Sequence, residues 1–160
     1  MKKLLLTLCL CAVSLCGFAQ SKGETAVGLN AGVAPYLGKG HGFTNFGLGL
    51  KAQYNATDAL RLEADLEYWA IDHYKGATDM SANVQYLFNL AEPFYIYPTI
   101  GIGYGHLNGA FESNNRLLVN AGVGMEYRTS EKISCGLEVK YQFMKDFQRL
   151  PITIGITYHL

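Results

Sequence analysis

Charged residues are scarce in this chain of 160 residues, of which they make up 16%. No basic run occurs beyond Lys2 and Lys3, and 13 basic residues balance 13 acidic ones, which excludes a nucleic-acid-binding protein. The apolar fraction of 49% excludes a disordered chain. After the N-terminus no apolar run approaches the ~20 residues that a membrane-spanning helix needs, so a helical membrane protein is excluded too.

The first twenty residues have the composition of a secretory signal. A positive start precedes an apolar run, Leu4 to Cys16, and small residues follow at Gly17 and Ala19. We expect cleavage after Ala19, so that residues 1–19 are a signal peptide and residues 20–160 form one domain. A transmembrane anchor and a lipoprotein are the alternatives. Only Cys135 remains after cleavage, so the mature chain is expected to form no internal disulfide.

The rest of the chain lacks a helical apolar stripe and instead alternates apolar and polar residues, which is typical of strands. Short turns at 57–58, 92–93 and 130–131 separate pairs of strands, and longer connections run over 36–43, 73–78, 108–115 and 145–149. This pattern predicts an all-β fold, an eight-stranded up-and-down antiparallel transmembrane β-barrel. Leu87 and Pro98 interrupt the pattern, and the proline should weaken pairing or mark a bulge. The predicted strands are 23–35, 44–56, 59–72, 79–91, 94–107, 116–129, 132–144 and 150–160.

Alternation alone does not decide which face is inside, and a soluble lipocalin-like ligand-binding barrel would turn the apolar face inward. Many glycines on the polar face favour a narrow lumen, in which small residues must face large ones. Charges of both signs on that face are expected to pair in the lumen. The predicted lumen charge network comprises Lys51, Arg61, Glu63, Asp65, Glu67, Glu126, Arg128, Lys132, Glu138 and Lys140. We expect loss of Glu63 or Glu138 to leave an unmatched lumen cation and to lower the unfolding temperature.

Aromatic residues of the apolar face lie near the strand ends, as they do at the two interfaces of a membrane. The strands also reach the ~9–11 residues that a bilayer-crossing strand needs. Both features favour an apolar face that points outward, into a membrane. The predicted aromatic girdle comprises Tyr54, Tyr68, Phe94, Tyr104, Tyr127, Tyr141 and Phe143.

The C-terminus resembles the β-signal by which the barrel-assembly machinery recognises Gram-negative outer-membrane proteins. Thr153, Gly155 and Tyr158 occupy its positions, and Leu160 stands where phenylalanine is usual. Residues 23–160 as a whole resemble the opacity-type and OmpX/OmpA-type eight-stranded barrels, in particular the porin-family proteins of Bacteroidetes. The resemblance implies a monomer in the outer membrane, with outer-membrane lipid and the assembly machinery as partners.

Candidate catalytic residues are few. Lipid A deacylases and palmitoyltransferases share this architecture and use His and Ser near the rim, where His41, His73, His106, Ser81 and Ser113 are expected. No serine occupies the slot after His106 that the deacylase motif requires, and the histidines lack metal-ligand spacing. We therefore predict no catalysis, cofactor or metal, although a lipid A-modifying enzyme remains an alternative.

Eight strands enclose a lumen only wide enough for side chains. We expect the charged side chains to plug it, so the predicted role is structural or in surface interaction. An extracellular ligand would meet the barrel through the four longer connections.

Overall fold

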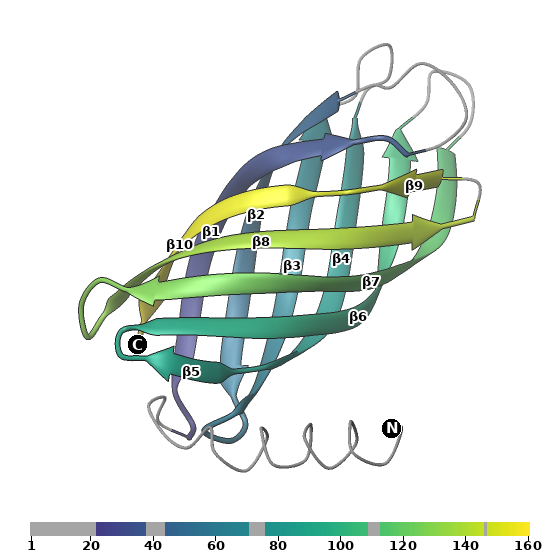
Figure 1. The fold of residues 1–160 in the computed structure, drawn as a ribbon. Coiled ribbons are helices and arrows are strands. Elements are labelled where there is room, and N and C mark those ends of the chain that lie inside the picture. Colours follow the sequence, from purple (N-terminus) through teal and green to yellow (C-terminus); the bar gives the residue numbers. More distant parts are fainter. Residues whose placement is uncertain (1–21, 38–43, 71–75, 109–112, 146) are drawn as a thin grey trace, which may run out of the picture.

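The computed structural model describes residues 22–37, 44–70, 76–108, 113–145 and 147–160 (Figure 1). Its strands wind around a common axis and close into a barrel. No helix among these residues is long and apolar enough to cross a membrane. The strands are β1 (Thr25–Pro35), β2 (Thr44–Asn55), β3 (Leu60–Ala70), β4 (Ala77–Tyr86), β5 (Phe88–Ala91), β6 (Phe94–Asn108), β7 (Ser113–Arg128), β8 (Ile133–Met144), β9 (Phe147–Arg149) and β10 (Ile152–His159).

The sheet closes because β10 pairs with both β1 and β8, always antiparallel. The order around the ring is β1, β2, β3, β4, β6, β7, β8 and β10. The short strand β5 continues β4, and the short strand β9 precedes β10 in the same position of the ring. The ring therefore has eight strand positions, which we call walls, as the alternation predicts. Closure pairs the backbone of the first strand with that of the last, so the ring itself has no edge strand.

The fourth predicted strand, 79–91, is divided in two, and Pro98 provides the reason. β4 pairs with β6 as far as Gln85–Thr99, and β5 resumes at Phe88–Ile96 in the same register. The gap lies opposite Pro98, which has no N–H to donate. Leu87 N donates instead to Ala59 O at 2.7 Å, and the Leu87 side chain is buried.

The last predicted strand also differs from the structure at its start. β10 begins at Ile152, and β9 lies in what the sequence suggested was the connection 145–149. Pro151 separates the two, since its ring nitrogen cannot donate to a ladder. β9 is anchored by the Tyr36–Arg149 bridge and by Leu37 N donating to Gln148 O at 2.9 Å. The proposed signal peptide and residues 38–43, 73–75 and 109–112 of the predicted connections lie outside the described residues.

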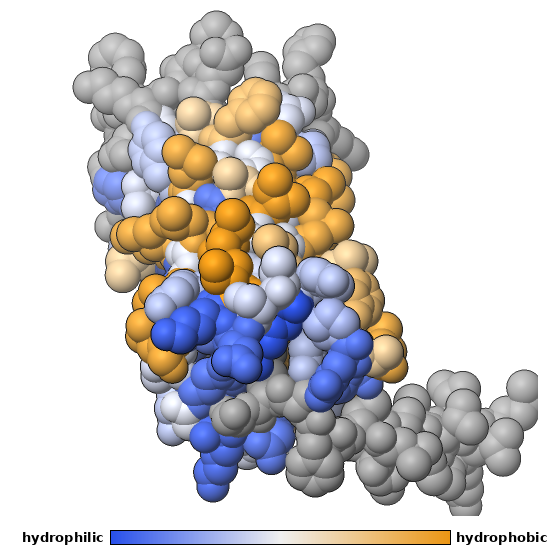
Figure 2. Space-filling model, turned by 90° about the vertical axis from the view of Figure 1, so that its left-hand side faces the viewer, coloured by the Kyte–Doolittle hydropathy of each residue, from blue (hydrophilic) through white to orange (hydrophobic). Residues whose placement is uncertain are grey.

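The apolar face points outward. Leu48 is 70% exposed and Ile154 is 64% exposed, whereas Asn120 and Gln142 on the other face are fully buried. In Figure 2 apolar side chains cover the barrel wall and hydrophilic ones gather at its lower end. The lipocalin-like alternative is therefore wrong, because it requires apolar side chains to fill the interior.

Candidate functional site

The polar lumen gathers most of the chain's buried charge, and its side chains fall into three layers along the barrel. The strand alternation places them there, because every second residue of each strand points inward. The short-turn layer, next to the turns, consists of Glu24, Arg61, Glu126, Arg128 and His159. The middle layer consists of Lys51, Glu63, Asp65, Glu67, Glu138 and Lys140, and the loop-end layer of Asp79 and Arg149.

The short-turn layer contains two ion pairs. Arg61 Nη1 lies 2.6 Å from Glu126 Oε2, and both side chains are almost fully buried. Arg61 Nε also donates to Asn55 Oδ1 at 3.1 Å. Arg128 Nη2 donates to the two Glu24 oxygens at 3.0 and 2.9 Å, which links β7 to the start of β1.

Ser134, His159 and Glu24 lie in the order of a serine–histidine–carboxylate group, and His159 Nδ1 lies 3.3 Å from Glu24 Oε1. Ser134 Oγ lies 3.0 Å from His159 Nε2, and Arg128 Nη2 lies 3.2 Å from His159 Nδ1. In the tautomer that accepts a hydrogen bond from this guanidinium at Nδ1, Nε2 carries the hydrogen and donates it to Ser134. A general base would need Nε2 free to accept the serine proton.

The middle layer is centred on Lys140. Its Nζ lies 2.6 Å from Asp65 Oδ2, 3.1 Å from Glu138 Oε1 and 4.0 Å from Glu67 Oε1. β8 and β3 are four walls apart in either direction around the ring, so the contact of Lys140 with Asp65 spans the full width of the lumen. This layer therefore connects opposite walls of the barrel at mid-height.

Neutral side chains complete the middle layer. Gln53 Nε2 donates to Glu63 Oε2 at 2.7 Å, and Asn83 Nδ2 donates to Asp65 Oδ2 at the same distance. The Tyr97 hydroxyl donates to Glu138 Oε2 at 3.1 Å. These donors come from β2, β4 and β6, so nearly every wall contributes to the network.

The loop-end layer pairs Arg149 with Asp79, again across the ring. The Arg149 guanidinium also stacks over the ring of Trp69, 4.9 Å from its centroid. The Trp69 indole N–H donates to Glu67 Oε2 at 3.3 Å, which connects this layer to the middle one. A cation over the face of a tryptophan is a favourable arrangement when both are desolvated.

Lumen glycines provide the room for these large side chains. Gly47 lies directly opposite Trp69 on β3, and Gly124 lies directly opposite Tyr97 on β6. A Cβ added at either glycine would overlap the facing aromatic ring. The predicted need of a narrow lumen for small residues opposite large ones is met at these two positions.

Nine of the ten predicted network residues lie on the lumen face, but Lys132 does not. It lies in the turn between β7 and β8 and is exposed, because the strand begins one residue later, at Ile133. Four further charged or titratable lumen residues were not predicted as part of the network, namely Glu24, Asp79, Arg149 and His159. The alternation of the predicted strands places Asp79 and His159 on the polar face. Arg149 was not predicted because it lies in the predicted connection 145–149.

The predicted aromatic girdle residues lie on the outer face. Tyr54, Tyr127 and Phe94 are near the short turns, and the others lie toward the opposite end. Of the proposed assembly signal, Thr153 is buried on the lumen face, whereas Tyr158 and Leu160 are 43% and 74% exposed on the outside.

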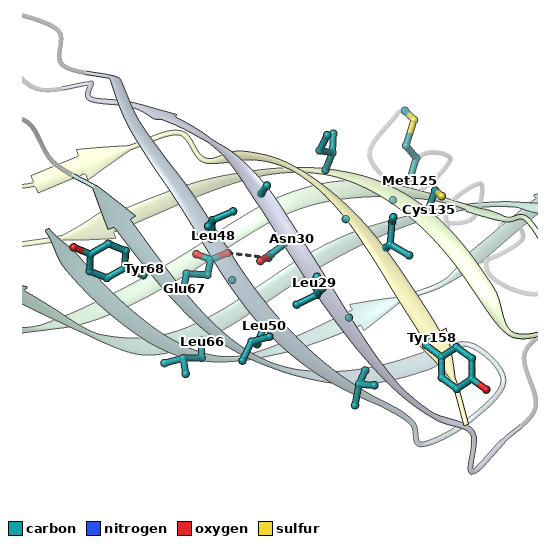
Figure 3. Close-up of a pocket in the computed structure, with 18 of the residues that line it drawn as sticks. Leu29, Asn30, Leu48, Leu50, Leu66, Glu67, Tyr68, Met125, Cys135 and Tyr158 are labelled. Carbon is teal, nitrogen blue, oxygen red and sulfur yellow. Dashed lines mark hydrogen bonds between the residues drawn. The ribbon is translucent and has the colours of Figure 1, made fainter.

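An apolar groove on the outer wall runs over β8, β10, β1, β2 and β3 (Figure 3). Leu29, Leu48 and Leu50 line it from the outside. Its polar members, Asn30 and Glu67, are lumen residues bonded to each other at 3.3 Å. Apart from these two side chains, the thiol of Cys135 and the hydroxyls of Thr78 and three tyrosines, the groove is lined by apolar side chains and backbone.

Of the candidate rim residues, the structure describes the side chains of His106 and Ser81. His41 and His73 lie outside the described residues, as does the side chain of Ser113. Ser81 Oγ donates to Asp65 Oδ2 at 3.4 Å, inside the lumen. In the part of the chain that the structure describes, no three His, Cys, Asp or Glu side chains are grouped to hold a metal ion.

A family model described as the outer membrane protein β-barrel domain matches residues 5–159. The chain belongs to this family. Membership in the outer membrane protein β-barrel domain family assigns it to the Gram-negative outer membrane. The apolar outer face is thus its lipid-facing surface. No curated protein sequence is detectably similar to the chain.

Solved structures of outer-membrane barrels have the same fold. Neisserial surface protein A (NspA) is 13% identical, with a TM-score of 0.72, over 84% of this chain and 96% of NspA. The N-terminal barrel domain of OprF from Pseudomonas aeruginosa is 15% identical, with a TM-score of 0.65, over 87% of this chain and 100% of that domain. Ail, the attachment invasion locus protein of Yersinia pestis, is 13% identical, with a TM-score of 0.59, over 87% of this chain and 99% of Ail.

Proposed function

We propose that this outer-membrane barrel is a closed scaffold with a structural or surface-interaction role, and that it neither conducts solutes nor catalyses a reaction. The contact of Lys140 with Asp65 across the full width of the lumen carries this proposal. The Arg61–Glu126 and Arg149–Asp79 pairs block the lumen on either side of it. An eight-stranded barrel has no spare width for water beside such pairs.

Single-channel recording in a planar bilayer tests the closed lumen. We expect no steady conductance from the folded barrel. The double variant D65N/K140A should serve as the comparison, because it removes the contact that spans the lumen while leaving both outer layers in place. A steady conductance of the unaltered barrel equal to that of the double variant would contradict the proposal.

The guanidinium of Arg128 beside His159 Nδ1 supports the absence of catalysis, since it favours the tautomer in which Nε2 donates to the serine oxygen. Mass spectrometry of lipid A from cells that express the barrel tests this directly. We expect the same lipid A masses with and without expression. A change in lipid A mass by one acyl chain on expression, absent when the S134A variant is expressed, would show that the barrel is an enzyme instead.

A surface-interaction role is supported by the name of the relative Ail, an attachment invasion locus protein. We propose that the segments 36–43, 73–78, 108–115 and 145–149 face the cell exterior and would meet any extracellular ligand. An epitope inserted between residues 109 and 112 should bind antibody on intact cells. An epitope inserted in the turn between Ser130 and Glu131 should bind only after permeabilisation, and the reverse pattern would overturn this topology.

A further inference from the structure

The middle layer of the lumen contains more negative charge than positive charge, unlike the layers on either side. In the short-turn layer, Arg61 and Arg128 pair with Glu126 and Glu24, and in the loop-end layer Arg149 pairs with Asp79. The middle layer instead sets Lys51 and Lys140 against four carboxylates, those of Glu63, Asp65, Glu67 and Glu138. Counted over the described residues, two of these carboxylates have no cation of their own.

The surplus carboxylates are deeply buried. Glu63 and Glu67 are each 3% exposed, and Asp65 and Glu138 are each 5% exposed. An ionised carboxylate is costly to bury unless an opposite charge compensates it. Lys140 is already shared among Asp65, Glu138 and Glu67, so one ammonium group serves three acids.

A second observation, independent of charge, is a shortage of hydrogen-bond donors. Asp65 Oδ1, Gln53 Oε1 and Asn120 Oδ1 are buried and accept no hydrogen bond from the described residues. Gln53 is bonded through its nitrogen to Glu63, and Asn120 is bonded through Asn83 to Asp65, so all three oxygens belong to this cluster. Buried acceptors are nearly always hydrogen-bonded in folded proteins. Three unpaired acceptors in one cluster therefore indicate a hydrogen-bond donor that the cluster lacks when all its carboxyl groups are ionised.

We propose that the middle layer holds at least one proton on its carboxylates at neutral pH. A proton supplies both missing quantities at once, because a protonated carboxyl loses its negative charge and gains an O–H donor. A metal ion is disfavoured, since no three acidic side chains among the described residues are grouped to bind one.

The groups that face this proton come from every neighbouring wall. Besides the middle-layer side chains of β2, β3 and β8, they are Asn30 of β1, Ser81 and Asn83 of β4, Tyr97 of β6 and Asn120 of β7. These additional groups are not cations. Arg61 and Arg149 of the adjacent layers also act on Glu63 and Glu67, but each already pairs with a carboxylate of its own layer, so two lumen carboxylates remain in surplus. The sealed lumen would then contain a proton-binding site, and folding at neutral pH would take up ~1 proton.

Infrared spectroscopy of the folded full-length barrel in detergent tests the inference through the carbonyl stretch of a protonated carboxylic acid. We expect this band at neutral pH in the folded protein and its loss on unfolding. The double variant D65N/E138Q leaves two carboxylates for two ammonium groups, so it should abolish the band. Glu131 is an exposed carboxylate in the turn between β7 and β8, so E131Q is the matched control and should retain it.

A pH titration of the melting temperature provides the second measurement. The folded state holds a proton that the unfolded state lacks, so the stability should fall as pH rises from neutral to alkaline. The fall should be smaller in D65N/E138Q than in the unaltered barrel or in E131Q.

Three outcomes would overturn the inference. They are absence of the acid band from the folded barrel, a band that survives in D65N/E138Q, and a melting temperature that depends on Na⁺ or Ca²⁺ concentration at constant ionic strength. The inference rests on the proposed closed lumen, and the recording distinguishes the two failures. An absent band in a barrel that conducts contradicts the closed scaffold, whereas an absent band in a barrel that does not conduct contradicts the proton site alone.

Discussion

The indole ring of Trp69 occupies the space that a side chain at Gly47 would fill, because the two residues lie directly opposite each other on β3 and β2. Trp69 is 1% exposed and is the only tryptophan of the chain. Its ring in turn supports the guanidinium of Arg149. A glycine on one strand thus makes room for the residue on which the loop-end layer is built.

Substituting Gly47 by alanine should therefore destabilise the barrel by about 1–3 kcal/mol, as overpacking does in a filled interior. Gly136 is a matched control, because the nearest atom to a Cβ added there is Met125 O at an ordinary 3.4 Å. We expect G136A to unfold like the unaltered barrel in a urea titration followed by gel mobility. Equal unfolding midpoints for G47A and G136A would contradict the packing relationship.

The Arg61–Glu126 pair should be among the most sensitive contacts of the lumen. E126Q leaves the buried guanidinium of Arg61 without its carboxylate partner, which costs about 3–5 kcal/mol in buried pairs. Lys132 is exposed in a turn, so K132A should change stability by less than about 0.5 kcal/mol. Thermal unfolding of both variants in detergent checks this, and an E126Q melting curve as high as that of K132A would refute it.

The charge count also changes what we expect of Glu138. The sequence suggested that its loss would leave an unmatched cation, but Lys140 also lies 2.6 Å from Asp65 and 4.0 Å from Glu67. We now expect E138Q to lower the melting temperature less than E126Q does. A larger drop for E138Q would show that the carboxylates of the middle layer are not in surplus.

The Arg149–Asp79 pair can be tested through the fluorescence of Trp69. R149Q leaves Asp79 buried without its cation, so the loop-end layer should loosen and acrylamide should quench Trp69 more strongly. Removing both charges in R149Q/D79N should restore most of the protection, because no unmatched charge remains. Quenching of the double variant as strong as that of R149Q would exclude the pair as the cause.

Cys135 points outward from β8 and is exposed on the lipid-facing wall. In the chain 20–160 reconstituted in vesicles, a fluorophore on Cys135 should be quenched by brominated acyl chains and protected from iodide. A fluorophore on K132C, in a C135S background, should behave in the opposite way because Lys132 lies in a turn. Iodide quenching of both labels would place this part of β8 outside the bilayer.

The proposed assembly signal predicts a separation between biogenesis and stability. Tyr158 is outward-facing and 43% exposed, so Y158S removes little packing inside the barrel. We expect slower insertion of Y158S in cells and unchanged refolding into detergent. Thr78 lies on β4, far from the C-terminal strand in sequence, and T78S provides a control that should insert normally. Equal insertion of both variants would remove Tyr158 from the signal.

The number of walls, their direction and the residues on each face all follow from the order of residues along the chain. The physical reason is that a strand alternates its side chains with a period of two, so the pattern of apolar and polar residues can be read directly. Even the break in the fourth wall was marked, by Leu87 on the polar face and by Pro98 on the next strand. One face of the strands is apolar and the other is polar and rich in glycine, and this difference also indicated that the apolar face turns outward.

Which charges pair with one another depends on the closed barrel. Asp65 and Lys140 are 75 residues apart in the chain, and their contact depends on the curvature and shear of the closed sheet, which no local pattern specifies. The same closure brought Arg149 out of a predicted loop to Asp79 and left Lys132 outside the lumen. It also divided the charges into layers and left two carboxylates of the middle one without cations. Partner choice inside a barrel is a property of its cross-section, whereas the sequence specifies only the inner face of each strand.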